Sequence, residues 1–212
     1  MKKIVLIGAG GHCKSCIDVI DSQNEWSIYG ILDAHVPAGS VVLGHTVLGG
    51  DEMIASLIQD GYSFLITIGQ IKTADLRETI FNKIKAASGR FATVVSAYAI
   101  VSRYSVIGEG SIIMHGAVVN ADALIGENCI INTCAIIEHD AKVGKHSHVS
   151  TNAVLNGGVN IGTHCFIGSG SVLVHGIAVC DHVIVGANAT VTKSIENAST
   201  YVGSPAQSLK NR

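Results

Sequence analysis

The first ninety residues alternate apolar runs with segments in which apolar residues recur at helical spacing. Short, predominantly apolar runs, which are typical of buried strands, occur within residues 2–8, 27–33 and 62–69. Helical spacing is found at residues 12–23, 51–59 and 72–87, and the last of these places Leu76, Ile80, Phe81 and Ile84 on one face. This order predicts an α/β domain of Rossmann-like type over residues 1–90, with a parallel sheet and crossover helices.

From about residue 95 the helical spacing disappears and glycines recur at a fixed interval. Four of them follow one another every 18 residues: Gly108, Gly126, Gly144 and Gly162. They belong to similar six-residue steps, VIGEGS, LIGENC, KVGKHS, NIGTHC, FIGSGS and IVGANA. Three such steps per turn predict a parallel β-helix over residues 91–212, whose coils stack and bury aliphatic side chains along the axis. Cys129 and Cys165 lie two coils apart at the same position of the repeat, so we expect both to face inward.

Composition narrows the class of protein. The chain has 212 residues, 24 of them glycine, and only 5% aromatic residues, so its core must be mainly aliphatic. A formal charge of -2 gives no basic field for nucleic acid or an anionic membrane. No signal peptide is expected, because the N-terminal apolar run is short and rich in glycine. No transmembrane helix is expected either, because the sequence has no uncharged apolar span of about 18 residues. We therefore expect a cytoplasmic protein whose six cysteines are reduced thiols.

The stretch NTCAIIEHDAKVGKHSHVS, residues 132–150, concentrates titratable groups in an otherwise apolar repeat. In the 18-residue register His139 aligns with Ala121 and Gly157, so it departs from its own repeat. Neutral imidazole suits a general base near neutral pH, and an adjacent carboxylate can fix its tautomer. The alternative is a histidine that only occupies an exposed corner of a coil.

A glycine-rich loop follows the first predicted strand and opens the first helix. Gly10, Gly11 and His12 lie in this loop, while Asp33 and Gly69 end the second and third strands. Open α/β sheets bind ligands at the carboxyl ends of their strands, and glycines let a phosphate approach the start of a helix. The loop departs from G-x-G-x-x-G, because Cys13 stands at the final position, so a simple tight turn is the alternative.

Several motifs together carry a resemblance to a known family. They are VLIGAGGH, ILD, ITIG, the series NT…IEHD…HSHVS and the C-terminal YVGSPA. The hexapeptide repeats resemble those of left-handed β-helix acyltransferases. With the N-terminal motifs, nearly the whole chain resembles the family of UDP-4-amino-sugar N-acetyltransferases of bacillosamine-type pathways and sialic acid O-acetyltransferases. The resemblance implies acetyl-CoA as acetyl donor, a UDP-4-amino-4,6-dideoxy sugar as acceptor, and a role in bacterial surface or protein glycan synthesis.

The resemblance also places the catalytic base at His139. We assign Asp140 or Glu138 as the carboxylate that orients it. Gly157 lies one coil further on, and its N–H is the candidate oxyanion donor unless this glycine only shapes the turn. Asn132 matches a family-like asparagine that helps to hold the site, although an inward asparagine ladder would explain it equally well.

Binding residues follow by the same resemblance. Contacts to acetyl-CoA are expected at His148, Ser169, Gly186 and Ala187. Contacts to the UDP-sugar are expected at Gly10, Gly11, His12, Asp33 and Gly69, with Asp33 near the uracil or the ribose. Family members are homotrimers with the site between subunits, which would bring His139 to the cofactor groups of a neighbour.

Other functions remain open at this point. O-acetylation of sialic acid or another nonulosonate would use the same fold, but a free sugar would leave the glycine loop without a purpose. A non-catalytic sugar-nucleotide sensor or scaffold has no need of a base at His139. Cys13 and Cys16 form a C-x-x-C at a helix start, a pattern of redox proteins, without the surroundings of a thioredoxin. A second C-x-x-C is missing, so no structural metal is expected.

Overall fold

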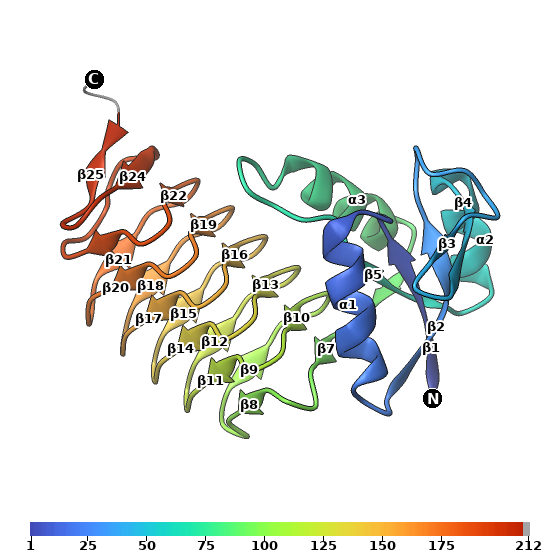
Figure 1. Cartoon of the computed structure of the whole chain (residues 1–212), viewed down its shortest axis with the longest axis horizontal. Helices are drawn as coiled ribbons and strands as arrows, with labels where there is room; N and C mark the ends of the chain where they lie inside the picture. The colour runs from blue at the N-terminus through green and yellow to red at the C-terminus, as the bar shows by residue number, and fades with distance from the viewer. Residues whose placement is uncertain (210–212) are drawn as a thin grey trace.

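The computed structural model describes residues 1–209 and consists of an N-terminal α/β unit followed by a long parallel β-helix (Figure 1). In the α/β unit the strands are β1 (Lys2–Ile7), β2 (Trp26–Leu32), β3 (Val41–Val42), β4 (His45–Gly49), β5 (Ser63–Ile66) and β6 (Arg90–Phe91). Its helices are α1 (Gly11–Asp21), α2 (Ile54–Gln59), which follows the 3₁₀ turn η1 (Asp51–Met53), and α3 (Asp75–Ala86).

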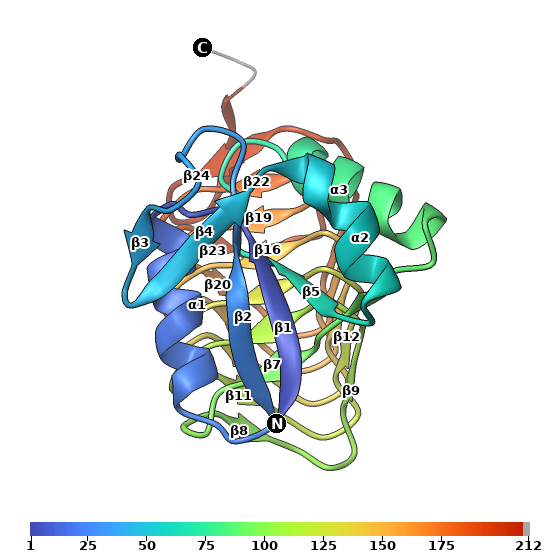
Figure 2. The ribbon, with the colours of Figure 1, turned by 90° about the vertical axis from the view of Figure 1, so that its right-hand side faces the viewer.

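The six strands form one sheet in the order β3-β4-β2-β1-β5-β6, parallel except for the β3–β4 pair. Helix α1 lies on one side of this sheet, and α2 and α3 lie on the other (Figure 2). Apolar residues fill both interfaces, as the predicted buried strands require. The predicted parallel sheet with crossover helices is confirmed.

The β-helix has three faces, each a stack of two-residue strands. Face I contains β7 (Val94–Val95), β10 (Ile112–Ile113), β13 (Ile130–Ile131), β16 (His148–Val149), β19 (Phe166–Ile167) and β22 (Ile184–Val185). Face II contains β8 (Ile100–Val101), β11 (Val118–Val119), β14 (Ile136–Ile137), β17 (Val154–Leu155), β20 (Val172–Leu173) and β23 (Thr190–Val191). Face III contains β9 (Val106–Ile107), β12 (Leu124–Ile125), β15 (Lys142–Val143), β18 (Asn160–Ile161) and β21 (Ala178–Val179). Strands β24 (Thr200–Val202) and β25 (Gln207–Ser208) extend face I at the far end.

The 18-residue period of the sequence is the distance along the chain between residues that pair in neighbouring coils. Gly108 shows why glycine recurs, because a Cβ there would lie 2.5 Å from the backbone of Gly126 in the next coil. Cys129 and Cys165 are fully buried in the aliphatic core, so their predicted inward direction is confirmed. Side chains therefore alternate between a packed axis and three outer faces, and the corners between faces are left to carry polar groups.

The junction between the two units is packed rather than open. Helix α1 and one side of the N-terminal sheet share a buried cluster with Ile112 and Ile130 of face I. The boundary predicted between residues 90 and 91 falls inside β6, whose Phe91 still pairs with Phe64 of β5. The first strand of the β-helix begins at Val94. Among the described residues, no helix combines the length and the apolar character needed to cross a bilayer.

Candidate active site

His139 and Asp140 form a hydrogen-bonded pair at the corner between faces II and III. His139 Nδ1 lies 2.8 Å from Asp140 Oδ2, and both side chains are exposed. The hydrogen bond to Asp140 is the main reason why the pKa of His139 is raised above its usual value. Since an ionised carboxylate only accepts, Nδ1 carries the proton and Nε2 keeps its lone pair, as a general base requires.

The sequence left open which carboxylate orients His139. Glu138 accepts a hydrogen bond from Asn120 Nδ2 at 2.9 Å, one coil away, and so belongs to a different contact. Asp140 is therefore the residue of the two that is in contact with His139.

Gly157 lies against the imidazole in the next coil. A Cβ at Gly157 would be 2.6 Å from both Cε1 and Nε2 of His139 and 3.1 Å from Nδ1 of His175. Within residues 1–209 the Gly157 N–H has no hydrogen-bond acceptor. A glycine at this position thus leaves room for the ring and an N–H available for a negatively charged oxygen. The oxyanion role itself stays a prediction.

A cavity of about 810 Å³ opens at the carboxyl ends of β1, β2 and β5. All five residues expected to bind the sugar nucleotide line it: Gly10, Gly11, His12, Asp33 and Gly69. A Cβ at Gly10 or Gly11 would meet nothing within 4 Å, so the start of α1 faces open space. Leu76, expected on the buried face of α3, is 57% exposed because it lies on the wall of this cavity instead.

Asp33 holds the glycine loop in place. Its Oδ2 accepts the N–H of Ala9 at 2.7 Å, and its Oδ1 accepts the N–H groups of His35 and Val36 at 2.8 and 2.9 Å. Partial burial acts to raise the pKa of Asp33, but these backbone hydrogen bonds outweigh it and hold the pKa below its usual value. Behind the loop, the buried hydroxyl of Thr67 donates to the carbonyl of Gly8 at 2.6 Å. Asp33 is thus an ionised carboxylate whose first function is to order the loop.

His148 and Asn132 lie where the β-helix meets the N-terminal unit. His148 Nδ1 donates to the carbonyl of Gln70 at 2.7 Å, and its Nε2 accepts from Asn132 Nδ2 at 3.0 Å. The His148 side chain is buried, and its ring centroid is 6.5 Å from that of His12. Burial lowers the pKa of His148 to about 4, against the opposing hydrogen bond to Gln70. Both ring nitrogens have partners in the chain, so contact of His148 with acetyl-CoA stays a prediction, and the structure does not bring Asn132 to His139 within one chain.

Ser169 and Ala187 lie on successive coils of the corner between faces I and II. The N–H of Asn188 donates to the carbonyl of Ser169 at 2.9 Å, and both Ser169 and Ala187 are exposed. Gly186 precedes Ala187 in the same turn. An extended ligand can lie along this stack, but the corner is not the one that carries His139.

The His139–Asp140 pair and the cavity are on different sides of one chain. The N-terminal unit packs on face I, whereas His139 is at the corner between faces II and III, opposite that face (Figure 1). An acceptor in the cavity therefore cannot reach His139 of the same chain by a small movement.

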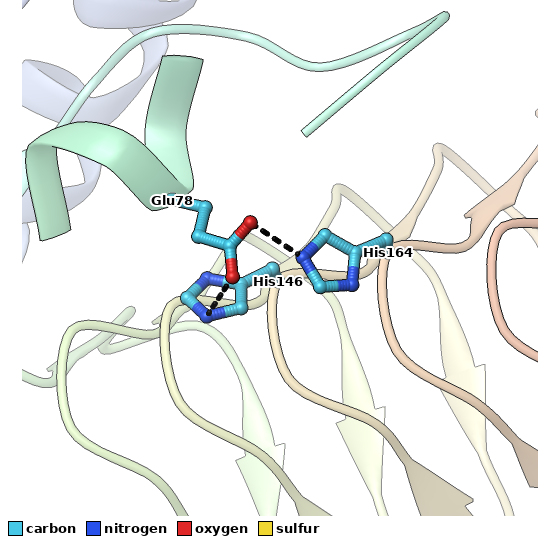
Figure 3. A group of neighbouring side chains, drawn as sticks. All are labelled: Glu78, His146 and His164. Atoms are coloured by element: carbon cyan, nitrogen blue, oxygen red, sulfur yellow. Dashed lines mark ion pairs between the residues drawn. The ribbon is translucent and has the colours of Figure 1, made fainter. Parts of the chain in front are cut away.

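A second cluster of titratable groups joins α3 to the corner between faces III and I (Figure 3). Glu78 Oε2 is 3.0 Å from His164 Nε2, and Glu78 Oε1 is 4.0 Å from His146 Nε2. These three side chains have the ligand types of a metal centre. However, Arg77 donates to Asn128 Oδ1 at 2.7 Å, so Asn128 must donate its Nδ2 to His146 Nδ1 at 2.9 Å. Neutral His146 then carries its proton on Nε2 and offers Glu78 a donor, not a lone pair for a metal.

The C-x-x-C cysteines are poor candidates for redox chemistry. Cys13 and Cys16 are fully buried, and burial raises the pKa of both thiols. A reactive cysteine needs exposure and a lowered pKa, and these two have neither.

Sequence reasoning missed several residues at the two sites. His175 lies next to His139, at 6.3 Å between ring centroids. The sequence held a signal for this contact, because 36 residues, or two coils of 18, separate the two histidines and place them at the same position of the repeat. Thr67 and Asp51 line the cavity without a motif of their own. Gln70 follows Gly69, but nothing in the sequence shows that its carbonyl receives His148.

Comparisons with known proteins agree with this geometry. The chain matches the PglD N-terminal domain over residues 3–84, the bacterial transferase hexapeptide (six repeats) over 104–139 and the hexapeptide repeat of succinyl-transferase over 158–193. It is 32% identical over 124 residues to the UDP-N-acetylbacillosamine N-acetyltransferase of Bacillus subtilis (strain 168), a match that covers 54% of this chain and 52% of that protein. The chain thus spans about half the length of this curated relative.

Two solved structures extend the likeness to the whole chain. PerB, the perosamine N-acetyltransferase of Caulobacter crescentus in complex with CoA and GDP-perosamine, is 30% identical with a TM-score of 0.90 over 98% of this chain and 97% of that one. The acetyltransferase domain of PglB from Neisseria gonorrhoeae FA1090 in complex with acetyl coenzyme A is 27% identical with a TM-score of 0.90, over 98% and 99%. The α/β unit joined to a left-handed hexapeptide β-helix is therefore confirmed as the fold.

Proposed function

Because this chain belongs to the sugar N-acetyltransferases that join a PglD-type N-terminal domain to hexapeptide repeats, we propose that it transfers the acetyl group of acetyl-CoA to the amino group of a nucleotide-linked amino sugar. The preferred acceptor is a UDP-4-amino-4,6-dideoxy sugar, in line with the curated relative. The single observation that carries the proposal is the His139–Asp140 pair beside the N–H of Gly157, which has no acceptor within residues 1–209.

The chemistry follows from these groups. Nε2 of His139 accepts a proton from the sugar amine as its nitrogen attacks the thioester carbonyl. The N–H of Gly157 donates to the oxygen that becomes negative in the tetrahedral intermediate. Collapse breaks the carbon–sulfur bond, forms the amide and returns the proton from His139 to the departing thiolate of CoA. Asp140 stabilises the imidazolium between these steps and keeps the ring in place.

The nucleotide is held in the cavity of the N-terminal unit. The start of α1 at Gly10 and Gly11 receives the diphosphate, and the loop ordered by Asp33 shapes the floor around it. Acetyl-CoA lies along the corner that carries Ser169, Gly186 and Ala187. Since this corner does not carry His139 of the same chain, the pantetheine arm reaches His139 of a neighbouring subunit.

A homotrimer makes one complete site from two chains. In a single chain the cavity and His139 lie on different sides of the β-helix, so the acceptor bound by one subunit is acetylated beside His139 of a neighbour. A cytoplasmic location fits this chemistry, because acetyl-CoA and nucleotide sugars are cytoplasmic metabolites and the six cysteines are free thiols.

The test is release of free thiol from acetyl-CoA with a panel of acceptors. The panel contains UDP-, GDP- and dTDP-linked 4-amino-4,6-dideoxy sugars and sialic acid, and mass spectrometry identifies the product. We expect CoA release with a nucleotide-linked amino sugar, an alkali-stable N-acetyl product and loss of release in His139→Ala. Release with sialic acid alone, giving an alkali-labile ester, would replace the proposal by O-acetylation. Binding of sugar nucleotide without release from any acceptor would favour a scaffold.

A further inference from the structure

The cavity that should hold a nucleotide diphosphate has the wrong charge on its walls. Of the described residues that line it, Asp33 and Asp51 carry carboxylates and Lys83 carries the only Lys or Arg cation. That cation already forms an ion pair, because Lys83 Nζ lies 3.1 Å from Asp51 Oδ2. The Asp, Lys and Arg side chains of the lining thus give a formal charge of about -1, although a diphosphate carries at least two negative charges.

A fully buried cation lies just beneath this lining. Arg77 in the first turn of α3 is 1% exposed. Its guanidinium donates to the carbonyls of Ile66 and Ile68 at 2.9 and 2.7 Å, and Ile68 is part of the cavity lining. On the other side it donates to the backbone carbonyl and to Oδ1 of Asn128 in the β-helix, at 3.1 and 2.7 Å.

Within the described part of the chain, no counter-ion accompanies this charge. All four acceptors of Arg77 are neutral oxygens, and within residues 1–209 no carboxylate oxygen lies within 4.0 Å of it. The adjacent Glu78 turns to His164 and His146 instead (Figure 3). Arginine is rarely fully buried without a partner charge, because desolvation of an unpaired ion is strongly unfavourable. An arginine retained in this state calls for an anion that arrives from outside the chain.

We infer that the buried guanidinium of Arg77 is the positive charge that recognises the diphosphate of the nucleotide, acting through the cavity floor together with the start of α1. The inference rests on the proposed function, since it assumes that the cavity binds a nucleotide. Arg77 does not touch the ligand. It acts by position, through a medium of low dielectric in which a charge is felt further than in water.

The charge of Arg77 also bears on His12 in the cavity lining. Burial lowers the pKa of His12 to about 3, and the charge of Arg77 is the next largest cause. His12 lines the cavity, as does Ile68, whose carbonyl accepts from Arg77 at 2.7 Å, so the guanidinium lies directly behind the lining where the diphosphate would bind. The pKa of Arg77 is lowered by burial to about 10, which leaves the group charged at neutral pH.

The experiment compares a charged and an uncharged ligand. Calorimetry measures the affinity of the whole protein for UDP, GDP and dTDP and for the corresponding nucleosides, and the diphosphate that binds best is then used throughout. An electrostatic role predicts that Arg77→Met weakens the diphosphate on the order of tenfold or more and leaves the nucleoside nearly unchanged. A purely structural role predicts equal weakening of both.

A second variant keeps the arginine and neutralises its charge with a carboxylate partner. Asn128→Asp places a carboxylate 2.7 Å from the guanidinium at a position whose positive φ of 55° aspartate also tolerates. This change pairs Arg77 and replaces the Nδ2 donor to His146 Nδ1 by an acceptor, so His146 must carry a proton on Nδ1 to keep that contact. With that proton in place the melting temperature should be preserved, while the ratio of diphosphate to nucleoside affinity falls. Loss of a merely structural contact cannot produce both effects. Asn160→Asp, on an exposed strand of face III, is the matched control and should leave the ratio unchanged.

The outcomes separate the inference from the proposed function. If the wild-type protein binds none of the three diphosphates, the cavity is not a nucleotide site and the proposed function fails with it. If it binds one, and folded Asn128→Asp keeps the wild-type ratio of affinities, Arg77 has no part in recognising the diphosphate. Should Arg77→Met not fold, Asn128→Asp alone decides the question.

Discussion

His139 and Asp140 are sequence neighbours whose side chains meet, with 2.8 Å between Nδ1 and Oδ2, because Asp140 adopts a left-handed backbone with φ of 61°. Consecutive residues of a strand point to opposite sides, so two neighbours can meet only where the chain bends. Aspartate tolerates the left-handed region better than most residues. The corner of the coil therefore provides both the turn and the carboxylate.

This pair makes the pH dependence of turnover testable. General base catalysis needs neutral His139, so turnover should fall as the pH drops through the pKa of this residue. Since Asp140 raises that pKa, Asp140→Asn should move the acidic limb of the kcat profile to lower pH and lower its plateau. His139→Ala should lose about 10²–10⁴-fold of kcat with the melting temperature preserved. An unchanged acidic limb in Asp140→Asn would show that the pair does not set the basicity of the site.

Gly157 should be intolerant of even one methyl group. A Cβ there would lie 2.6 Å from two atoms of the His139 ring, so Gly157→Ala must displace the base from its position. We expect a loss of roughly 10²-fold in kcat, the order expected for a misplaced catalytic group, with little change in unfolding temperature. His175→Ala is the control, since it empties the other side of Gly157 and leaves the His139–Asp140 pair in place. Full turnover in Gly157→Ala would remove this glycine from the site.

Asp33 should matter through the loop that it orders. Asp33→Asn keeps the shape, but if its amide oxygen remains on His35 and Val36, its NH₂ group faces the N–H of Ala9. Two donors then oppose each other, so the glycine loop shifts and the KM for the sugar nucleotide should rise about tenfold while kcat changes less. Steady-state kinetics at saturating acetyl-CoA separate the two parameters. A fall in kcat alone would place Asp33 in the chemical step.

The proposed division of the site between subunits can be tested by mixing inactive chains. Asp33→Ala is defective in the cavity and His139→Ala in the base, and at sugar-nucleotide concentrations well below the KM of the Asp33 variant each homotrimer should have little activity. Co-expression with two different tags and purification through both gives mixed trimers. If one chain supplies the cavity and its neighbour the base, some interfaces in these trimers are intact and activity returns. Activity no greater than that of the parents would mean that both groups act within one chain.

Much of the fold was predictable because it is set by contacts between neighbouring coils. The period of 18 reflects a local requirement, since Gly108 must leave room for the backbone of Gly126, and each coil repeats it. His139 stood out for the same reason, as an exception in a regular series. The choice between Asp140 and Glu138 was not predictable, because it depends on the backbone angle at the corner rather than on spacing.

The burial of residues at the junction of the two units could not be predicted from the sequence either. Arg77 is a charged residue in an amphipathic helix, so its sequence position suggests an exposed side chain. It is buried instead, because α3 packs on the β-helix through Asn128. Leu76 shows the reverse, since the face expected to be buried ends at an open cavity. Contacts between units that are far apart in sequence leave no periodic signal.

His148 is buried at that junction, and its protonation should make the stability of the protein depend on pH. His148 has a pKa of about 4 in the folded protein and about 6.5 when unfolded, so the unfolded chain binds a proton more readily. The stability contributed by neutral His148 is complete above pH 6.5 and is lost as the pH falls toward 4, by up to about 1.4 kcal/mol per pH unit. Urea unfolding between pH 7 and 4.5 should therefore show a shallower dependence on pH in His148→Gln than in the wild type, whatever the absolute stability of the variant. His175→Gln, on the outer side of the β-helix, is the matched control and should keep the wild-type slope. Equal slopes in His148→Gln and the wild type would mean that this ring is hydrated or charged at the junction, and that its hydrogen bonds to Gln70 and Asn132 do not persist in solution.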